Sequence, residues 1–266
     1  MRLKPTNLLS IQTHTMDSTA QAVEKIQSVW RSYYSRSKCL LSQTQFHRRT
    51  LRQRFQDELQ GYHMLNEEPV KESTWEELNR NLVKGIFPIS CEAHGNHKSG
   101  MDNQFGNWGI SNKTATETKK AIKISSYRLT TVCDQSNPGN ENTIKEEIEK
   151  RDSSYDYYSL LGRIEDKKSK KITYKWYMIP KTCKAIDPCA FPWSSKVGLR
   201  GKKQGKQVGW QSQNMEISFA MSSQLWLSFP IEQIQRFCVC ETTINLSQTQ
   251  KITYAEMMAK LQTLKI

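Results

Sequence analysis

Apolar and polar residues alternate along several stretches of the chain, and such alternation predicts β-strands with one buried face. The segments YYSLLGRIED (157–166) and KKITYKWYMIP (170–180) follow one another and predict a hairpin whose turn lies near Lys168. AIKISSYRLTTVC (121–133) and FAMSSQLWLSFP (219–230) each predict a further strand. Because these strands need a common partner for their apolar faces, we expect a central β-sheet.

Helical patterns lie on both sides of these strands. Residues 19–59 contain neither glycine nor proline and repeat apolar residues at helical spacing, which predicts a largely helical segment. Ser73 to Glu77 has the form of a capping box and predicts a short helix that ends near Val83. The charged segment 143–151 is either a helix or a mobile insertion, and 254–266 predicts an amphipathic helix.

The order of these elements indicates the fold class. Helices come first, a block of strands follows, and a helix closes the chain, which is typical of an α+β (mixed α/β) fold. We expect a central mixed β-sheet flanked by helices, with an N-terminal helical extension. The predicted division is a basic helical region over 1–70 and one larger domain over 71–266.

The charge balance points to a polyanionic partner. Lys and Arg together number 39 and Asp and Glu 26, which gives a net charge of +13 and an isoelectric point near 9.4. Such a surplus suits nucleic acid, although a generically basic protein has it too. We find no apolar run of membrane-spanning length and no secretory signal, so we expect no membrane partner and an intracellular location, in the cytoplasm or with the nucleoid or nucleus. Seven cysteines, an odd number, predict reduced thiols.

The N-terminal segment has a second pattern of its own. Every charged residue between Lys25 and Arg54 is basic. Within it, IQSVWRSYYSR (26–36) resembles the calmodulin-binding IQ motif, with serine in place of the usual glycine. This resemblance implies a calmodulin-like partner at 26–36, and the alternative is a helix that packs its apolar side on the rest of the protein.

The candidate chemistry lies between Cys91 and Arg128. Asp102 follows one strand-like run and Lys113 follows the next, with Gly106 and Asn107 as turn residues between them. Adjacent strand ends would bring the carboxylate and the ammonium together. A carboxylate and a backbone oxygen suffice for Mg²⁺, which keeps several waters, and a neighbouring lysine can orient a water for attack on a phosphodiester.

This arrangement resembles the PD-(D/E)XK nuclease superfamily, which includes most type II restriction endonucleases. Gly100-Met101-Asp102 stands for its first element and Ser111-Asn112-Lys113 for its second. The resemblance implies a Mg²⁺-dependent endonuclease that cuts double-stranded DNA as a homodimer. Asp102 would hold the metal and Lys113 would position the nucleophile.

The chain departs from that pattern where Ser111 replaces the second acid. The missing carboxylate has to come from elsewhere, and Glu117, Glu92, and the helical Glu76 or Glu77 are candidates. We favour Glu92 as the second metal ligand and Glu77 as an auxiliary helical acid, and we keep Glu117 as a further catalytic candidate.

Residues that contact DNA are expected on both sides of this site. His94 and His97 are expected to contact phosphate or bases, although they could instead hold a transition metal, and Arg128 is a further candidate. A basic, glycine-rich stretch from Lys196 to Gln213 has the composition of a DNA-contacting loop or of a flexible surface loop. Its candidate contacts are Arg200, Lys202, Lys203, Gln204 and Lys206.

Two other functions fit the same sequence. One is a non-enzymatic nucleic-acid-binding or adaptor protein that uses the basic segment from Lys25 to Arg54. The other is a structure-specific nuclease, such as a junction resolvase, with the same fold.

Overall fold

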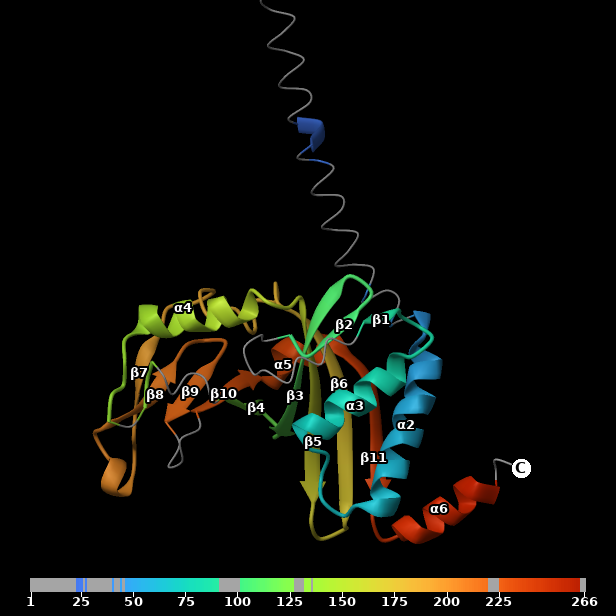
Figure 1. Ribbon diagram of the computed structural model, residues 1–266. Coiled ribbons are helices and arrows are strands. Elements are labelled where there is room, and N and C mark those ends of the chain that lie inside the picture. The colour runs from blue at the N-terminus through green and yellow to red at the C-terminus, as the bar shows by residue number, and fades with distance from the viewer. Residues whose placement is uncertain are drawn as a thin grey trace, which may run out of the picture. The chain divides into compact units, whose positions relative to one another are not determined.

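The structure, a computed structural model shown in Figure 1, describes residues 46–90, 101–126, 132–134, 136–219 and 225–263, together with positions 23–25, 27, 40 and 44. The chain divides into two units, Met1–Thr44 and Gln45–Ile266. The predicted boundary near residue 70 therefore lies inside the second unit. Ile26, Arg31 and Arg36 of the IQ-like segment lie outside the described residues.

One mixed sheet dominates the second unit. In the part of the chain that is described it has eleven strands, nine of them in the order β11-β6-β5-β3-β4-β10-β9-β8-β7, while β1 pairs with β2 and β2 with β3. The strands are β1 (Ile89–Ser90), β2 (Asn103–Phe105), β3 (Trp108–Glu117), β4 (Ala121–Ser126), β5 (Tyr157–Asp166), β6 (Lys171–Pro180), β7 (Ser194–Val197), β8 (Gln207–Gln211), β9 (Glu216–Phe219), β10 (Leu225–Pro230) and β11 (Cys238–Asn245). The β3–β5 pair is parallel and the other named pairs are antiparallel. The predicted α+β class with a central mixed sheet is thus confirmed.

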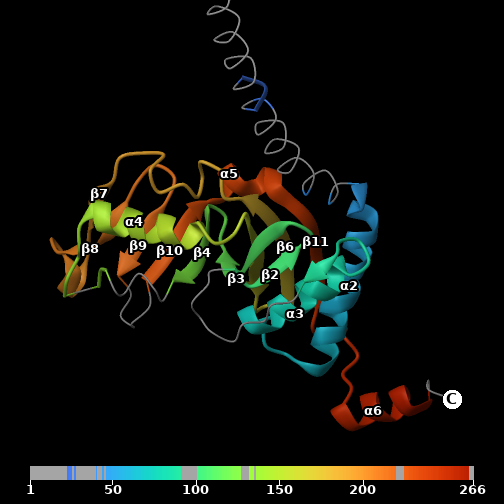
Figure 2. The same cartoon turned by 45° about the horizontal axis from the view of Figure 1, so that its top comes forward.

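Two helices cover one face of the sheet at its β11 end (Figures 1 and 2). They are α2 (Arg48–Leu65) and α3 (Glu72–Val83). Their aromatic residues Phe55 and Trp75 meet Trp176 of β6, with ring centroids 6.4 and 6.0 Å from that of Trp176. All three side chains are fully buried, so these contacts fix both helices on the sheet.

The opposite face forms a second core. Helix α4 (Glu141–Asp152) contributes Ile144 and Ile148, which cluster with buried residues of β4, β9 and β10 such as Ile122, Ile217 and Phe229. Short turns α5 (Ile231–Ile234) and η3 (Gln235–Phe237) continue from β10. Because successive strand residues point to opposite faces, α3 and α4 lie on opposite sides of the sheet.

The sheet is open along one side of β3. Strand β2 pairs with β3 only at Trp108–Ile110, and β4 pairs with it only at Thr116 and Glu117. Within the described residues, positions 111–115 of β3 are therefore paired with β5 alone.

Several predicted elements are confirmed. The β5–β6 hairpin, the helix over α4 and the closing helix α6 (Tyr254–Thr263) form where the patterns place them. Helix α3 ends at Val83 as predicted, but the capping box is wrong: the cap is Lys71, without a side-chain hydrogen bond. Within the described residues, five cysteines are free thiols, and no helix is long and apolar enough to cross a bilayer.

Candidate active site

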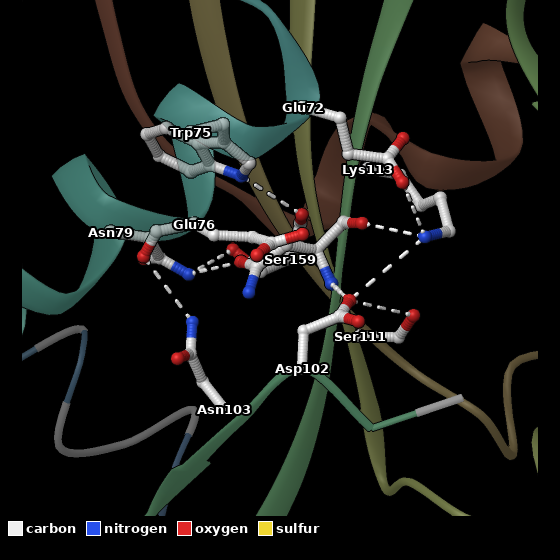
Figure 3. A network of polar contacts seen from close by, with 10 residues as sticks. Glu72, Trp75, Glu76, Asn79, Asp102, Asn103, Ser111, Lys113 and Ser159 are labelled. Atoms are coloured by element: carbon white, nitrogen blue, oxygen red, sulfur yellow. Dashed lines mark hydrogen bonds and ion pairs between the residues drawn. The ribbon is translucent and has the colours of Figure 1, made fainter. Parts of the chain in front are cut away.

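Asp102 lies immediately before β2, beside the open edge of β3. Its backbone N–H donates to the Ile110 carbonyl at 2.8 Å, which fixes its position across the β2–β3 turn. Its Oδ2 accepts the backbone N–H of Asn112 at 2.6 Å and the Ser111 hydroxyl at 3.4 Å (Figure 3). All of these side-chain contacts use Oδ2, so among the described residues Oδ1 has no hydrogen-bond donor.

Lys113 supplies the ammonium of the site. Its Nζ lies 3.9 Å from Oδ2 of Asp102 and donates to Glu72 Oε1 and to the Asn112 carbonyl, both at 2.8 Å. The backbone N–H and carbonyl of Asn112 thus face the gap between β2 and β4, where no strand of the described part of the chain pairs with them. The carboxylate of Asp102 and the ammonium of Lys113 bind these backbone groups in place of a neighbouring strand. The carbonyl oxygen of Asn112 therefore lies next to the carboxylate of Asp102.

Helix α3 adds two further carboxylates to this region. Glu72 and Glu76 are four residues apart, on the same side of the helix, and both appear beside Asp102 and Lys113 in Figure 3. Burial, followed by the charges of Asp102 and Glu72, raises the pKa of Glu76. Burial also raises the pKa of Asp102, although Lys113 and the Asn112 amide act in the other direction. Three carboxylates therefore lie near the ammonium of Lys113, and Arg80 is a second cation near Glu76. An added cation would relieve the remaining repulsion between the acids.

A buried hydrogen-bond network supports the site from behind. The Asn79 amide on α3 donates to Asn112 Oδ1 at 2.6 Å and to Ser159 Oγ at 2.7 Å. The indoles of Trp75 and Trp176 donate to the same serine, at its carbonyl and its hydroxyl. This network connects α3, β3, β5 and β6. It therefore fixes the position of α3, with Glu72 and Glu76, relative to Lys113.

Glu117 lies elsewhere on β3. It is only 5 % exposed, and its carboxylate binds Lys175 Nζ at 2.5 Å and the Tyr177 hydroxyl at 2.9 Å. At about 3.3 Å per strand residue, it is roughly 13 Å along β3 from Lys113. The structure does not bring Glu117 to Asp102, because its ion pair belongs to the packing between β3 and β6.

Glu77 is also absent from the site. Its side chain is exposed and lies near Glu58 of α2, whose pKa is raised by burial and also by the charge of Glu77. One helical residue turns a side chain by about 100°, so Glu76 faces Asp102 while Glu77 faces α2. From the sequence, Glu76 and Glu77 are predicted as alternative helical acids of the site. Glu72 is not predicted, because it lies before the segment interpreted as a capping box.

The other candidate residues fall into two groups. Glu92, His94, His97 and Arg128 lie outside the described residues. The basic stretch predicted as a loop forms the β7–β8 hairpin, at the far end of the strand order from β11. Its Arg200, Lys202, Lys203, Gln204 and Lys206 are therefore separated from Asp102 by several strands.

The donors at the open edge suit a hard cation. Among the described residues, no three His, Cys, Asp or Glu side chains converge closely enough to form a complete metal cage. Mg²⁺ does not need such a cage, because it is commonly held by one or two carboxylates and keeps several waters. Asp102 and the Asn112 carbonyl could bind it directly, and Glu76 could bind one of its waters.

Comparison with family models, with curated proteins and with solved structures finds no match for the chain. The geometry and chemistry of the site must therefore decide which function is proposed.

Proposed function

We propose that the protein is a Mg²⁺-dependent endonuclease that hydrolyses phosphodiester bonds of double-stranded DNA, in the manner of a type II restriction enzyme. The observation that carries this proposal is the ammonium of Lys113, 3.9 Å from the carboxylate of Asp102 at the open edge of β3. The acids of α3 beside this pair supply the carboxylate that Ser111 lacks.

Each residue of the site has a distinct role in this proposal. Asp102 and the Asn112 carbonyl would hold the cation, and Glu76 would orient one of its waters. A bound Mg²⁺ neutralises charge on the phosphate and makes a bound water more acidic. Lys113 donates a hydrogen bond to the attacking water or to the phosphate, and Glu72, which binds its ammonium at 2.8 Å, orients it. The proposal thus takes Glu76 and Glu72 in place of Glu117 and Glu77, while Glu92 lies outside the described residues.

The charge of the chain supports DNA as the substrate. A net charge of +13 favours a polyanion, and the acid-poor β7–β8 hairpin offers cations away from the site. Cutting both strands of a duplex requires two sites, so we propose a homodimer related by a two-fold axis. Light scattering of the full-length chain, with and without DNA, measures whether it is a monomer or a dimer.

Plasmid cleavage tests the proposal. The full-length chain and its Asp102→Asn and Lys113→Met variants are incubated with supercoiled plasmid and Mg²⁺, with Lys119→Met, an exposed lysine in the β3–β4 turn, as the matched control. We expect wild type and Lys119→Met to cut, and the two site variants to lose at least a hundredfold in rate. Sequencing the ends identifies the recognition site and the stagger.

Other outcomes separate the alternatives. Equal cutting by the two site variants would show that the activity arises elsewhere. DNA binding without cutting under Mg²⁺, Mn²⁺ or Ca²⁺ favours the adaptor function, and preferential cutting of branched DNA favours a junction resolvase.

A further inference from the structure

The tip of the β7–β8 hairpin is an ordered turn. The N–H of Gly198 donates to the Lys206 carbonyl at 2.9 Å, and the N–H of Gly205 donates back to the Gly198 carbonyl at 3.0 Å. Gly201 and Gly205 have φ angles of 62° and 74°, which L-residues rarely adopt. A Cβ on Gly198 would lie 2.2 Å from the Lys203 carbonyl oxygen, so the two sides of the turn touch. The tip is therefore held in one conformation by its own backbone.

This turn presents one large apolar side chain among cations. Leu199 is 84 % exposed, and Val197 next to it is 47 % exposed. From residue 188 to residue 215 the sequence contains no acid. Its basic residues are Lys196, Arg200, Lys202, Lys203 and Lys206, and only Lys196 has an acid partner among the described residues, Glu216 at 2.6 Å.

We propose that Leu199 is a wedge that enters the base stack of duplex DNA while the surrounding cations bind the phosphates on either side. Apolar side chains carried on basic elements unstack base steps in this way and bend the duplex. Leu199 packs on nothing that would bury it in the free protein, and an opened base step offers it an apolar surface. The inference rests on the duplex DNA substrate of the proposed function and adds the way in which that substrate is held.

The composition of the hairpin favours DNA over a lipid surface. Membrane-bound segments of this size carry several apolar side chains on one face, whereas this tip offers Leu199 and a partly exposed Val197. Gln204 is exposed within the turn, and glutamine amides pair with base edges, for which lipid has no counterpart.

The sheet sets the distance between this wedge and the candidate site. From β3 to β7 there are five strand spacings of about 4.8 Å, or roughly 24 Å across the sheet. At about 3.4 Å per base pair, this spans roughly seven base pairs. The wedge is therefore expected within about ten base pairs of the cut.

The sheet face between them is polar. Lys123, Lys196 and Ser218 point away from the α4 core, on the face that α3 also occupies, because they alternate with Ile122 and Ile217 of that core. A duplex that contacts both the site and the hairpin would thus lie over polar side chains, the lysine Lys123 and the Lys196–Glu216 ion pair.

The test uses 2-aminopurine, whose fluorescence rises when it is unstacked. DNA that the full-length chain binds is first selected and sequenced. Duplexes of that sequence are then made, each with one 2-aminopurine at a different base step within about ten base pairs of the cut or footprint. Two conditions keep the DNA intact: the wild-type chain in Ca²⁺ without Mg²⁺, and the Asp102→Asn variant. We expect a several-fold rise in fluorescence at one step, loss of that rise and roughly tenfold weaker binding for Leu199→Ala, and retention of both for Leu199→Met. Ile164→Ala, at an exposed residue of β5, is the matched control and should behave as wild type.

The cations are tested by salt dependence. Replacing Arg200 and Lys202 by glutamine should reduce the slope of log K against log salt by about 1.8, since each phosphate contact contributes about 0.9. The Leu199→Ala variant should leave this slope unchanged, because the leucine carries no charge.

Failure of this inference is distinguishable from failure of the proposed function. If the plasmid is cut but Leu199→Ala keeps the fluorescence rise and the affinity, the wedge is overturned and the nuclease stands. If the rise depends on Leu199 but no divalent ion supports cutting, the nuclease fails and the wedge stands. Leu199-dependent binding to phosphatidylserine vesicles, with no fluorescence change on DNA, would overturn the wedge in favour of a lipid surface.

Discussion

Lys113 lies 3.9 Å from the carboxylate of Asp102, yet its two hydrogen bonds go to Glu72 and to the Asn112 carbonyl. The ammonium therefore sits between the acid and the backbone oxygen that would together bind a cation. In the proposed enzyme, Asp102 and the Asn112 carbonyl would hold a cation, and the ammonium of Lys113 would then be free to donate to the phosphate.

The first prediction concerns stability and pH. Burial raises the pKa of Asp102, so ionisation of this group costs the folded state free energy once the pH exceeds the value for the unfolded chain, about 3.9. In EDTA at pH 7, Asp102→Asn should therefore be more stable than wild type by about 0.5–2 kcal/mol. This gain should disappear as the pH falls toward 4, where the wild-type carboxyl is protonated. Urea unfolding of both proteins between pH 4 and pH 8 measures this difference in stability. A difference that grows toward acid pH would contradict a raised pKa for Asp102.

The second prediction concerns divalent ions. A ligand that binds only the folded state raises its stability by an amount that grows with ligand concentration. Millimolar Mg²⁺ or Ca²⁺ should therefore raise the melting temperature of wild type in thermal denaturation. Asp102→Asn should show little of this rise, and an equal rise in both proteins would mean that the ions bind elsewhere.

The third prediction separates two neighbouring acids. Glu76 faces Asp102, while Glu77 faces α2, so the two form a matched pair of substitutions. Glu76→Gln should lower the cleavage rate by roughly tenfold to a hundredfold because it removes the group that orients a water. Glu77→Gln should leave the rate within about twofold of wild type, and the reverse order would place Glu77 in the site.

The fourth prediction concerns the network behind the site. Asn79→Ala leaves the buried Asn112 Oδ1 without its donor, at about 1–3 kcal/mol, whereas Ser159 Oγ keeps the indole of Trp176. The free energy of unfolding in urea should fall by about 1–3 kcal/mol. Ser73→Ala, at an exposed residue of the same helix, should change it by less than about 0.5 kcal/mol.

The fifth prediction concerns the second acid of β3. Lys175→Met leaves the carboxylate of Glu117 buried without its cation and should cost about 3–5 kcal/mol. The double variant Glu117→Leu/Lys175→Met should recover part of that loss, because an apolar pair can replace a buried ion pair while the Tyr177 hydroxyl loses its acceptor. At a temperature where it is folded, this double variant should cut DNA at the wild-type rate. A large loss of rate would return Glu117 to the catalytic group.

The sequence predicts the pairing of Asp102 and Lys113 for a sound physical reason. A turn at Gly106, whose φ is 59°, reverses the chain and forces its flanks together. The detail differs, because Asp102 precedes β2 and Lys113 lies in the middle of β3. Hydrogen bonding across the hairpin sets this register, and residue types alone do not specify it.

Other features depend on contacts distant in the sequence. Glu76 rather than Glu77 faces the site because Trp75 packs on Trp176, a residue of a later strand. The β7–β8 hairpin was predicted only as a loop because its glycines weaken the strand signal. Strand β11 was not predicted, since an irregularity between Cys238 and Cys240 breaks its alternation.

The parallel pairing of β3 with β5 has a consequence for biosynthesis. Asn79 is anchored through Ser159, and β3 needs β5 as its neighbour at Lys113. During translation, the acids of α3 cannot be aligned with Lys113 until the ribosome has released the chain beyond Asp166. The proposed active site would therefore be assembled only after more than half of the chain has been made.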